Sequence, residues 1–240
     1  MNAQPPARPG MSGADAGRLA GLGLLGPIVA ATLVGALHVL PETASISPVR
    51  RTISEYALTD TAWAFNVGVV ALALGSLAIL VAAVQAGLAG VRSFGCWLAL
   101  AWVVALLTVV AFPKHNWAVG PSTDGQIHRV ASLIAFICLP SAVLLLTRRR
   151  RTRAADPAAR AAFWLGVLSL AWLGCLLGAW LISPITGIPW WRALPIGLVE
   201  RGLVLCEVAA VVALGVWVVT STKRTQVALS ATPARTAPAA

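Results

Sequence analysis

Charged residues are scarce in this chain. Of its 240 residues, 18 are lysine or arginine and 8 are aspartate or glutamate, so charged residues make up 11% against 58% hydrophobic ones. The mean hydropathy is +0.83. An ordinary soluble domain is far less apolar, so this scarcity excludes that class.

Cysteine pairs are also lacking. The four cysteines stand singly inside apolar segments, without CxxC spacing: Cys96, Cys138, Cys175 and Cys206. This pattern excludes a disulfide or zinc framework of the usual spacing, and we interpret the four residues as small buried apolar side chains.

The chain lacks internal repeats and the alternation of apolar and polar residues that marks β-strands. Its apolar residues come in six long blocks, at about 19–40, 62–86, 95–112, 128–147, 161–183 and 199–220. Each reaches the roughly 17–25 residues that a helix needs to cross ~30 Å of hydrocarbon. The sequence therefore predicts an all-α polytopic membrane protein with six transmembrane helices in one domain, residues 18–222. Residues 1–17 and the low-complexity residues 223–240 are predicted to be disordered cytoplasmic ends.

Basic residues set the predicted orientation. Twelve lie on the side of the N-terminus: Arg8, Arg18, Arg92, Arg148–Arg151, Arg153, Arg160, Lys223, Arg224 and Arg235. Six lie on the other side: Arg50, Arg51, Lys114, Arg129, Arg192 and Arg201. The positive-inside rule then places both termini in the cytoplasm. Because this topology explains the net charge of +10, the expected partner is membrane lipid and no nucleic acid.

Polar groups gather at the predicted outer ends of the blocks. All three histidines lie there, together with five of the eight carboxylates: His38, His115, His128, Glu42, Glu55, Asp60, Asp124 and Glu200. We therefore expect the chemistry of the protein on one face of the membrane.

The first outer segment, residues 46–57, has two possible helix starts, at Ser47 before Pro48 and at a capping box from Thr52 to Glu55. On a helix, Arg51 and Glu55 share a face. They form either a surface ion pair or a site in which Arg51 holds an anionic group and Glu55 acts as base or ligand.

The second outer segment runs from Phe112 to Arg129. Asp124 and His128 are four residues apart and share a helical face, while His115 arrives from the other end of the loop. Such a carboxylate can orient the imidazole, or His115, Asp124 and His128 can together hold a metal such as zinc. The sequence itself requires no cofactor.

The third outer segment leads to Glu200 and Arg201, which open the last block. Glu207 follows seven residues later, about 10 Å deeper on nearly the same face. A carboxyl group at that depth should face the bundle interior or water. The small number of charged residues in the blocks argues against an ion-coupled pump, for which Glu207 is the one favourable feature. The blocks also lack the matching pair of interrupted helices that would indicate a transporter. In the fifth block, Gly174-Cys-Leu-Leu-Gly178 predicts close packing within the monomer rather than a dimer seam.

Four short motifs resemble an uncharacterised prokaryotic membrane family called domain of unknown function 998. They are Ile53-Ser-Glu, Phe112-Pro, Ile127-His128 and Glu200-Arg201. The resemblance covers roughly residues 20–220. It implies a six-span helical protein of the prokaryotic inner or plasma membrane, that is, the cell membrane, with no established activity. Ser54, Glu55, His128, Glu200 and Arg201 are its motif positions, without assigned roles.

Three functions are consistent with the outer polar cluster. In the first, Arg51, Ser54, Glu200 and Arg201 bind a lipid head group or small amphiphile. In the second, the protein is a membrane-embedded metal-dependent hydrolase or transferase acting on outer-leaflet lipid, with His128, Asp124 and Glu55 as catalytic residues. In the third, the cluster is purely structural and ties the outer helix ends together.

Overall fold

The computed structural model describes residues 13–116, 118–148 and 156–231, and these residues form helices and connections without a strand. In chain order the α-helices (α) and 3-10 helices (η) are α1 (Gly13–Gly23), α2 (Leu25–Ala36), η1 (Pro41–Thr43), η2 (Ile53–Leu58), α3 (Ala62–Gln85), α4 (Phe94–Ala111), α5 (Thr123–Thr147), α6 (Pro157–Thr186), α7 (Trp190–Ala193) and α8 (Ile196–Ser230).

Six helical segments are long and apolar enough to cross a membrane, and they coincide with the six predicted blocks. The prediction of a six-helix membrane-spanning protein is confirmed. The first segment consists of α1 and α2, which are separated at Leu24. Because Pro27 has no N–H to donate to the Gly23 carbonyl, the hydrogen-bond ladder is interrupted there, while Leu24 keeps helical dihedral angles.

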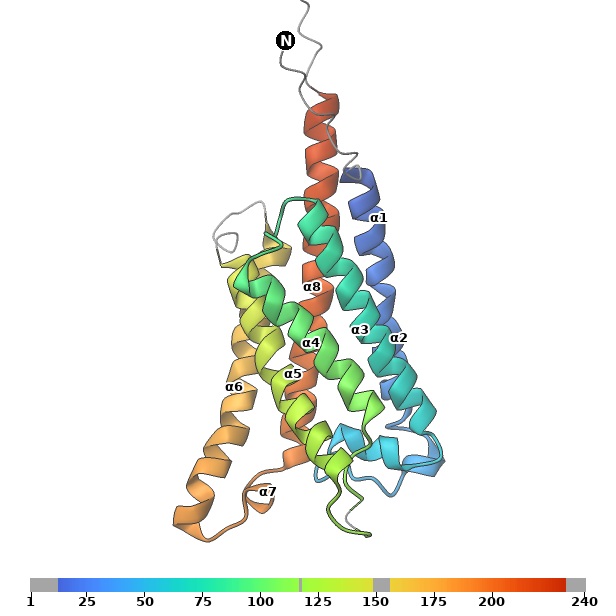
Figure 1. The fold of residues 1–240 in the computed structure, drawn as a ribbon, viewed down its shortest axis with the longest axis vertical. Coiled ribbons are helices and arrows are strands. Elements are labelled where there is room, and N and C mark those ends of the chain that lie inside the picture. The colour runs from blue at the N-terminus through green and yellow to red at the C-terminus, as the bar shows by residue number, and fades with distance from the viewer. Residues whose placement is uncertain (1–12, 117, 149–155, 232–240) are drawn as a thin grey trace, which may run out of the picture.

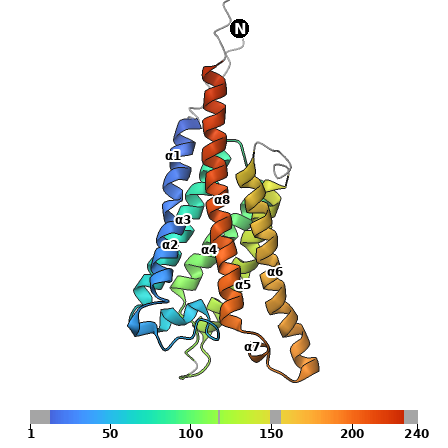
Figure 2. The ribbon, with the colours of Figure 1, turned by 180° about the vertical axis from the view of Figure 1, so that it is seen from behind.

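Helix α8 packs against α6, α1, α5, α3 and α2, and in Figure 2 it runs along the near side of the bundle between α1 and α6 (Figures 1 and 2). The main apolar core includes the nearly fully buried Trp102 of α4 and Trp217 of α8.

We call the end of the bundle where α1 begins and α8 ends the terminal end. The opposite end, where residues 37–61, 112–122 and 187–195 connect the helices, is the loop end (Figure 1).

Glycines let the first span approach α3 closely. A Cβ atom on Gly23 would lie 2.7 Å from the Gly75 carbonyl oxygen, and one on Gly26 would lie 2.8 Å from the Gly75 Cα. Backbone atoms cannot move aside as a side chain can. These positions therefore require glycine, as is common where membrane helices cross.

The ends of the membrane domain differ from the predicted boundaries. Helix α1 already begins at Gly13, and α8 continues to Ser230, so residues 223–230 are helical. The extension is held at the terminal end, where Arg224 Nη2 lies 2.5 Å from Oδ1 of the buried Asp156. The remaining parts of the predicted disordered ends, 1–12 and 232–240, lie outside the described residues, as do Arg149–Arg151 and Arg153.

The expectation of close packing at the GxxxG motif of α6 is wrong. An added Cβ on Gly174 or Gly178 would meet nothing within 4 Å, and Cys175 is exposed whereas the other three cysteines are buried. Trp172 packs over Gly202 of α8, and from Gly174 to Thr186 no residue of α6 is buried. Beyond Trp172 the helix thus stands apart from the bundle, as Figure 1 shows.

Candidate functional site

The loop end contains a polar network centred on Arg201, in the second turn of α8. Its Nε donates to His38 Nε2 at 2.7 Å, and its Nη1 faces the carbonyl oxygens of Pro48 (2.8 Å), Arg51 (2.7 Å) and Gly197 (3.0 Å). Its Nη2 lies 3.4 Å from the Tyr56 hydroxyl. The guanidinium is directed at acceptors of the protein itself, which favours the structural alternative for Arg201 over the binding of an anionic ligand.

His38 and Tyr56 complete the surroundings of this guanidinium. Tyr56 is fully buried, its ring meets the His38 ring edge-on at 5.2 Å, and the Arg201 guanidinium carbon lies 5.9 Å from its centroid. His38 Nδ1 lies 2.7 Å from the Val34 carbonyl oxygen. Since Nε2 accepts from Arg201, this contact assigns the ring proton to Nδ1.

A close backbone contact seats residues 48–51 on the start of α8. The Gly197 N–H donates to the Val49 carbonyl at 3.0 Å, and a Cβ on Gly197 would lie 2.9 Å from the Arg51 nitrogen and also collide with the Arg51 carbonyl. These residues form a turn rather than the helix that Ser47 and Pro48 suggested. The Arg201 guanidinium and the Gly197 N–H thus both bind carbonyl groups of the same turn.

Glu200 connects α8 to η2. Its carboxylate Oε2 accepts the Ile53 backbone N–H at 3.1 Å, and the residue is 9% exposed. Thr52 occupies the N-cap position of η2 but accepts no bond there with its side chain. The expected capping box is therefore replaced by a carboxylate from another helix, 147 residues further along the chain.

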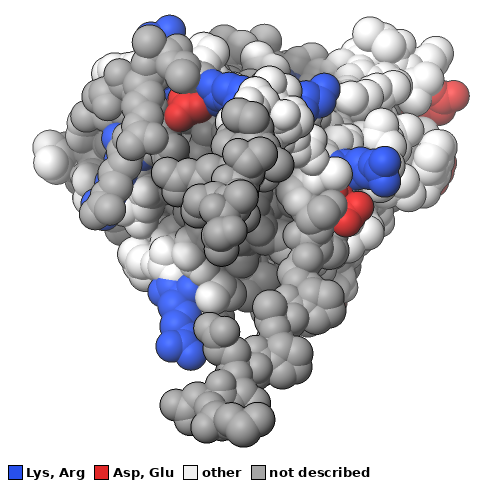
Figure 3. Space-filling model, turned by 90° about the horizontal axis from the view of Figure 1, so that it is seen from above, with Lys and Arg blue, Asp and Glu red and all other residues white. Residues whose placement is uncertain are grey.

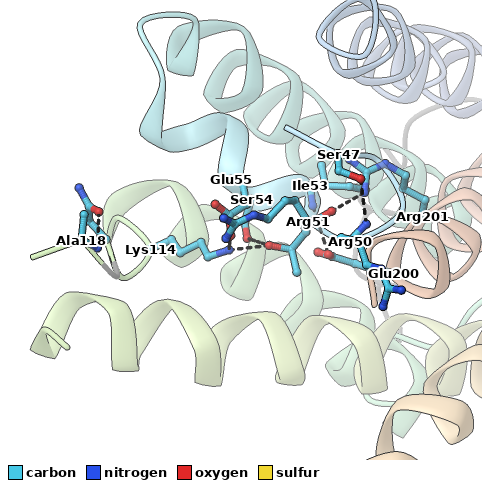
Figure 4. A network of polar contacts seen from close by, with 12 residues as sticks. Ser47, Arg50, Arg51, Ile53, Ser54, Glu55, Lys114, Ala118, Glu200 and Arg201 are labelled. Atoms are coloured by element: carbon cyan, nitrogen blue, oxygen red, sulfur yellow. Dashed lines mark hydrogen bonds and ion pairs between the residues drawn. The ribbon is translucent and has the colours of Figure 1, made fainter. Parts of the chain in front are cut away.

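Lys114 joins the α4–α5 connection to the same network (Figure 4). Its ammonium lies 2.7 Å from Glu55 Oε1 and 2.5 Å from Thr52 Oγ1, and it interacts electrostatically with Glu200. Arg51, by contrast, is 3.9 Å from Glu55 and its side chain is 59% exposed. The neighbouring Ser54 hydroxyl lies 3.2 Å from that of Thr52. Glu55 is thus held chiefly by Lys114.

The second outer segment does not assemble its proposed metal ligands. Among the residues that the structure describes, no group of three or more His, Cys, Asp or Glu side chains is placed to hold a metal ion. Asp124 is exposed, and His115 is buried against Gly125, with its Nδ1 accepting the Ser122 N–H at 2.9 Å. Ser122, rather than Thr123, caps α5 through a 3.1 Å bond from the Gly125 N–H.

His128 is buried between α4 and α5. Its Nδ1 contacts the carbonyl oxygens of Phe112 (2.9 Å) and Val109 (3.1 Å), which both lack a helical partner at the end of α4. Its Nε2 is enclosed without a partner among the described residues. The imidazole therefore serves as a cap for α4, and Glu55 and Asp124 are not its partners in any described contact.

Three members of the network were given no role in a site by the sequence analysis, although His38 and Lys114 were placed at the outer ends: His38, Tyr56 and Lys114. His38 and Lys114 stand alone in loop segments without a motif, and Tyr56 is the only tyrosine of the chain. The position of this one tyrosine, directly after the Ile53-Ser-Glu motif, was the feature of the sequence that could have indicated its role in the network. The contacts themselves join residues more than 50 positions apart, which no local pattern predicts.

A groove on the side of the bundle offers a different kind of site. It has a volume of about 630 Å³, opens to the surroundings and is lined by α4 from Trp97 to Thr108 and by α5 from Gln126 to Ile134. Its walls are almost entirely apolar. At the loop end of the groove, the guanidinium of the exposed Arg129 contacts the Gln126 side chain.

Fold and site together define a polytopic membrane protein with six helices of membrane-spanning length, in which a polar network at one end joins α8 to the connections that follow α2 and α4. The chain belongs to the family described as protein of unknown function (DUF998), whose family model matches residues 24–217. The resemblance read from the four short motifs is thereby confirmed. No curated protein and no solved structure matches the chain.

Proposed function

We propose that this protein binds a membrane lipid, with an acyl chain in the α4–α5 groove and an anionic head group at Arg129. The observation that carries the proposal is the groove itself, which is apolar, open and about 630 Å³ in volume. Ligand sites commonly measure about 300–1,000 Å³ and combine an apolar lining with a few polar groups.

The length of the groove supports an acyl chain as the occupant. Along α4, the lining residues Trp97 and Thr108 are eleven positions apart, which is about 16 Å of helix. One leaflet contributes about half of the ~30 Å hydrocarbon layer. A groove of this length on a membrane-spanning helix pair therefore suits one chain of a bilayer lipid.

Charge at the loop end supports an anionic head group. Arg129 is exposed, and its described contact is with Gln126 on its own helix, so donors remain for a ligand. A guanidinium presents paired donors that match phosphate and carboxylate. Under the positive-inside rule, the loop end lies on the outer side of the membrane, so the lipid would belong to the outer leaflet.

The loop-end network has a separate role in this proposal. Arg201, Glu200, Lys114 and Glu55 already bind one another or the protein backbone. We assign them to holding the connections at the end of the bundle, which keeps the α4–α5 pair in a fixed geometry.

The experiment is native mass spectrometry of purified protein in nanodiscs of mixed phosphatidylglycerol and phosphatidylcholine. Ala101→Phe fills the groove, and Ala171→Phe adds the same ring at an exposed position of α6. We expect Ala101→Phe to raise the Kd for lipid about tenfold, equivalent to ~1.4 kcal/mol, and so to lower the fraction of protein with bound lipid, with no change for Ala171→Phe.

A second pair of variants tests the head group. Arg129→Gln should remove the preference for phosphatidylglycerol over phosphatidylcholine, while Arg192→Gln, at an exposed arginine of α7, should keep it. Equal lipid occupancy in wild type and Ala101→Phe would contradict the groove. Equal selectivity in wild type and Arg129→Gln would contradict the head-group site.

A further inference from the structure

Glu207 is a carboxyl group buried in the middle of the last span. It is 5% exposed, and its Oε1 is enclosed without a hydrogen-bond partner among the described residues. It lies seven residues beyond Glu200 on the buried side of α8, about 10 Å further into the bundle. Nothing in the proposed lipid site uses this group.

The spans contain no counter-ion for this carboxyl. Residues 19–36, 62–85, 94–111, 130–147, 161–186 and 202–222 include no other Asp, Glu, Lys, Arg or His, and the charged Asp15 and Arg18 of α1 lie at the terminal end. The titratable group known to interact with it is the thiol of Cys206 beside it on α8. The packed helices add the thiols of Cys138 on α5 and Cys175 on α6, and Glu200, Arg201 and His128 lie toward the loop end. An unpaired ionised carboxylate in such surroundings costs several kcal/mol, far more than the neutral acid.

A single carboxyl also limits which cation it can hold. Calcium and magnesium take six or more oxygen ligands, and zinc takes about four ligands. The described residues offer no group of three or more ligating side chains. A proton needs only the one carboxylate oxygen.

We infer that Glu207 is a proton-binding site inside the membrane that is loaded from the loop end by way of Glu200. Glu200 is itself buried, and its Oε2 already bonds the Ile53 N–H. It also interacts electrostatically with Lys114, which contacts the partly exposed Glu55. The two carboxyl groups thus lie about 10 Å apart on the buried side of α8, Glu200 in the polar network and Glu207 toward the membrane interior.

Infrared spectroscopy of the protein in liposomes tests both parts of this inference. At neutral pH, we expect a carbonyl band of a protonated carboxylic acid that Glu207→Gln abolishes and Glu200→Gln keeps. Transfer to D2O should shift the wild-type band within minutes, and at least about tenfold more slowly in Glu200→Gln. Glu42→Gln, which changes an exposed carboxylate of the loop end, should leave band and rate unchanged.

Two outcomes would overturn the site: a band that Glu207→Gln does not remove, or a band that stays unshifted in D2O for hours. An unchanged exchange rate in Glu200→Gln would overturn the loading route.

Should Glu207→Gln fail to fold, wild-type protein can be treated with dicyclohexylcarbodiimide, which reacts with protonated carboxyl groups in apolar surroundings. We then expect an adduct on Glu207 by peptide mass spectrometry, and its absence would refute the proton site. Neither measurement depends on the lipid groove.

Discussion

Arg201 shows how one charged side chain can connect distant parts of a membrane protein. It bonds the end of the first span through His38, the turn at residues 48–51 through two carbonyls, and η2 through Tyr56. All three nitrogens of the planar guanidinium take part in these contacts. A lysine ammonium is a point charge on a flexible stem and cannot reach all of these directions at once.

Replacing Arg201 by lysine should therefore destabilise the protein although the charge is retained. Hydrogen bonds from a charged donor contribute about 1.5–3 kcal/mol each, and Arg201→Lys keeps only some of them. We expect a loss of about 3 kcal/mol, which lowers the melting temperature in detergent by roughly 6–12 °C. Arg192→Lys on the exposed α7 is the control and should melt like wild type. Equal melting of wild type and Arg201→Lys would show that the network carries no stability.

At the scale of elements, the short helix η2 depends on a residue from α8. The Ile53 N–H opens η2 and is buried, and the Glu200 carboxylate satisfies it. This bond substitutes for a local cap, because the Thr52 side chain accepts no bond from η2. The geometry of this connection is thus determined by the bundle rather than by its own sequence.

Substitutions at Glu200 separate the hydrogen bond from the charge. Glu200→Gln retains a side-chain oxygen that can accept the Ile53 N–H, so we expect stability within about 1 kcal/mol of wild type. Glu200→Ala leaves a buried donor unsatisfied and should cost about 1–3 kcal/mol. Thermal unfolding in detergent, followed by circular dichroism, measures both. A larger loss for the glutamine variant than for the alanine variant would refute the capping role.

The elements differ in how far the sequence predicts them. The six spans follow from the length of apolar segments alone, since only a helix satisfies its backbone groups within the hydrocarbon layer. The contacts at the loop end cannot be predicted from the length of segments. Glu200, Arg201 and Glu55 were singled out as candidate site residues and lie in the polar network, but the sequence did not predict their contacts with Ile53, His38 and Lys114. The same limit explains the wrong prediction at the GxxxG motif. Its glycines permit close packing, but the motif does not indicate which helix would pack there.

At the scale of the whole molecule, the polar groups are distributed along α8 from one end of the bundle to the other. Arg201 and Glu200 lie at the loop end, Glu207 lies within the membrane, and Arg224 binds Asp156 at the terminal end. The other spans are nearly free of charge. Because α8 also contacts five other helices, it connects both polar ends to the core.

The distribution of basic residues around the bundle predicts its orientation. Figure 3 views the terminal end, and basic side chains lie around it. The described basic residues of this end are Arg18, Arg92, Arg148, Arg160, Lys223 and Arg224. Of the six basic residues at the loop end, Lys114 and Arg201 are bound within the network. From the positive-inside rule we therefore predict that the terminal end faces the cytoplasm.

Cysteine labelling in intact cells tests this orientation. In a variant with all four native cysteines replaced by alanine, Arg192→Cys adds an exposed thiol at the loop end and Arg92→Cys adds one at the terminal end. A membrane-impermeant maleimide should label Arg192→Cys in intact cells and Arg92→Cys only after permeabilisation. The reverse pattern would show that the loop end faces the cytoplasm. Arg129 and its proposed lipid would then lie in the cytoplasmic leaflet, which carries a negative surface potential where anionic lipids are abundant. The labelling result therefore decides which leaflet supplies the lipid and from which side a proton reaches Glu207.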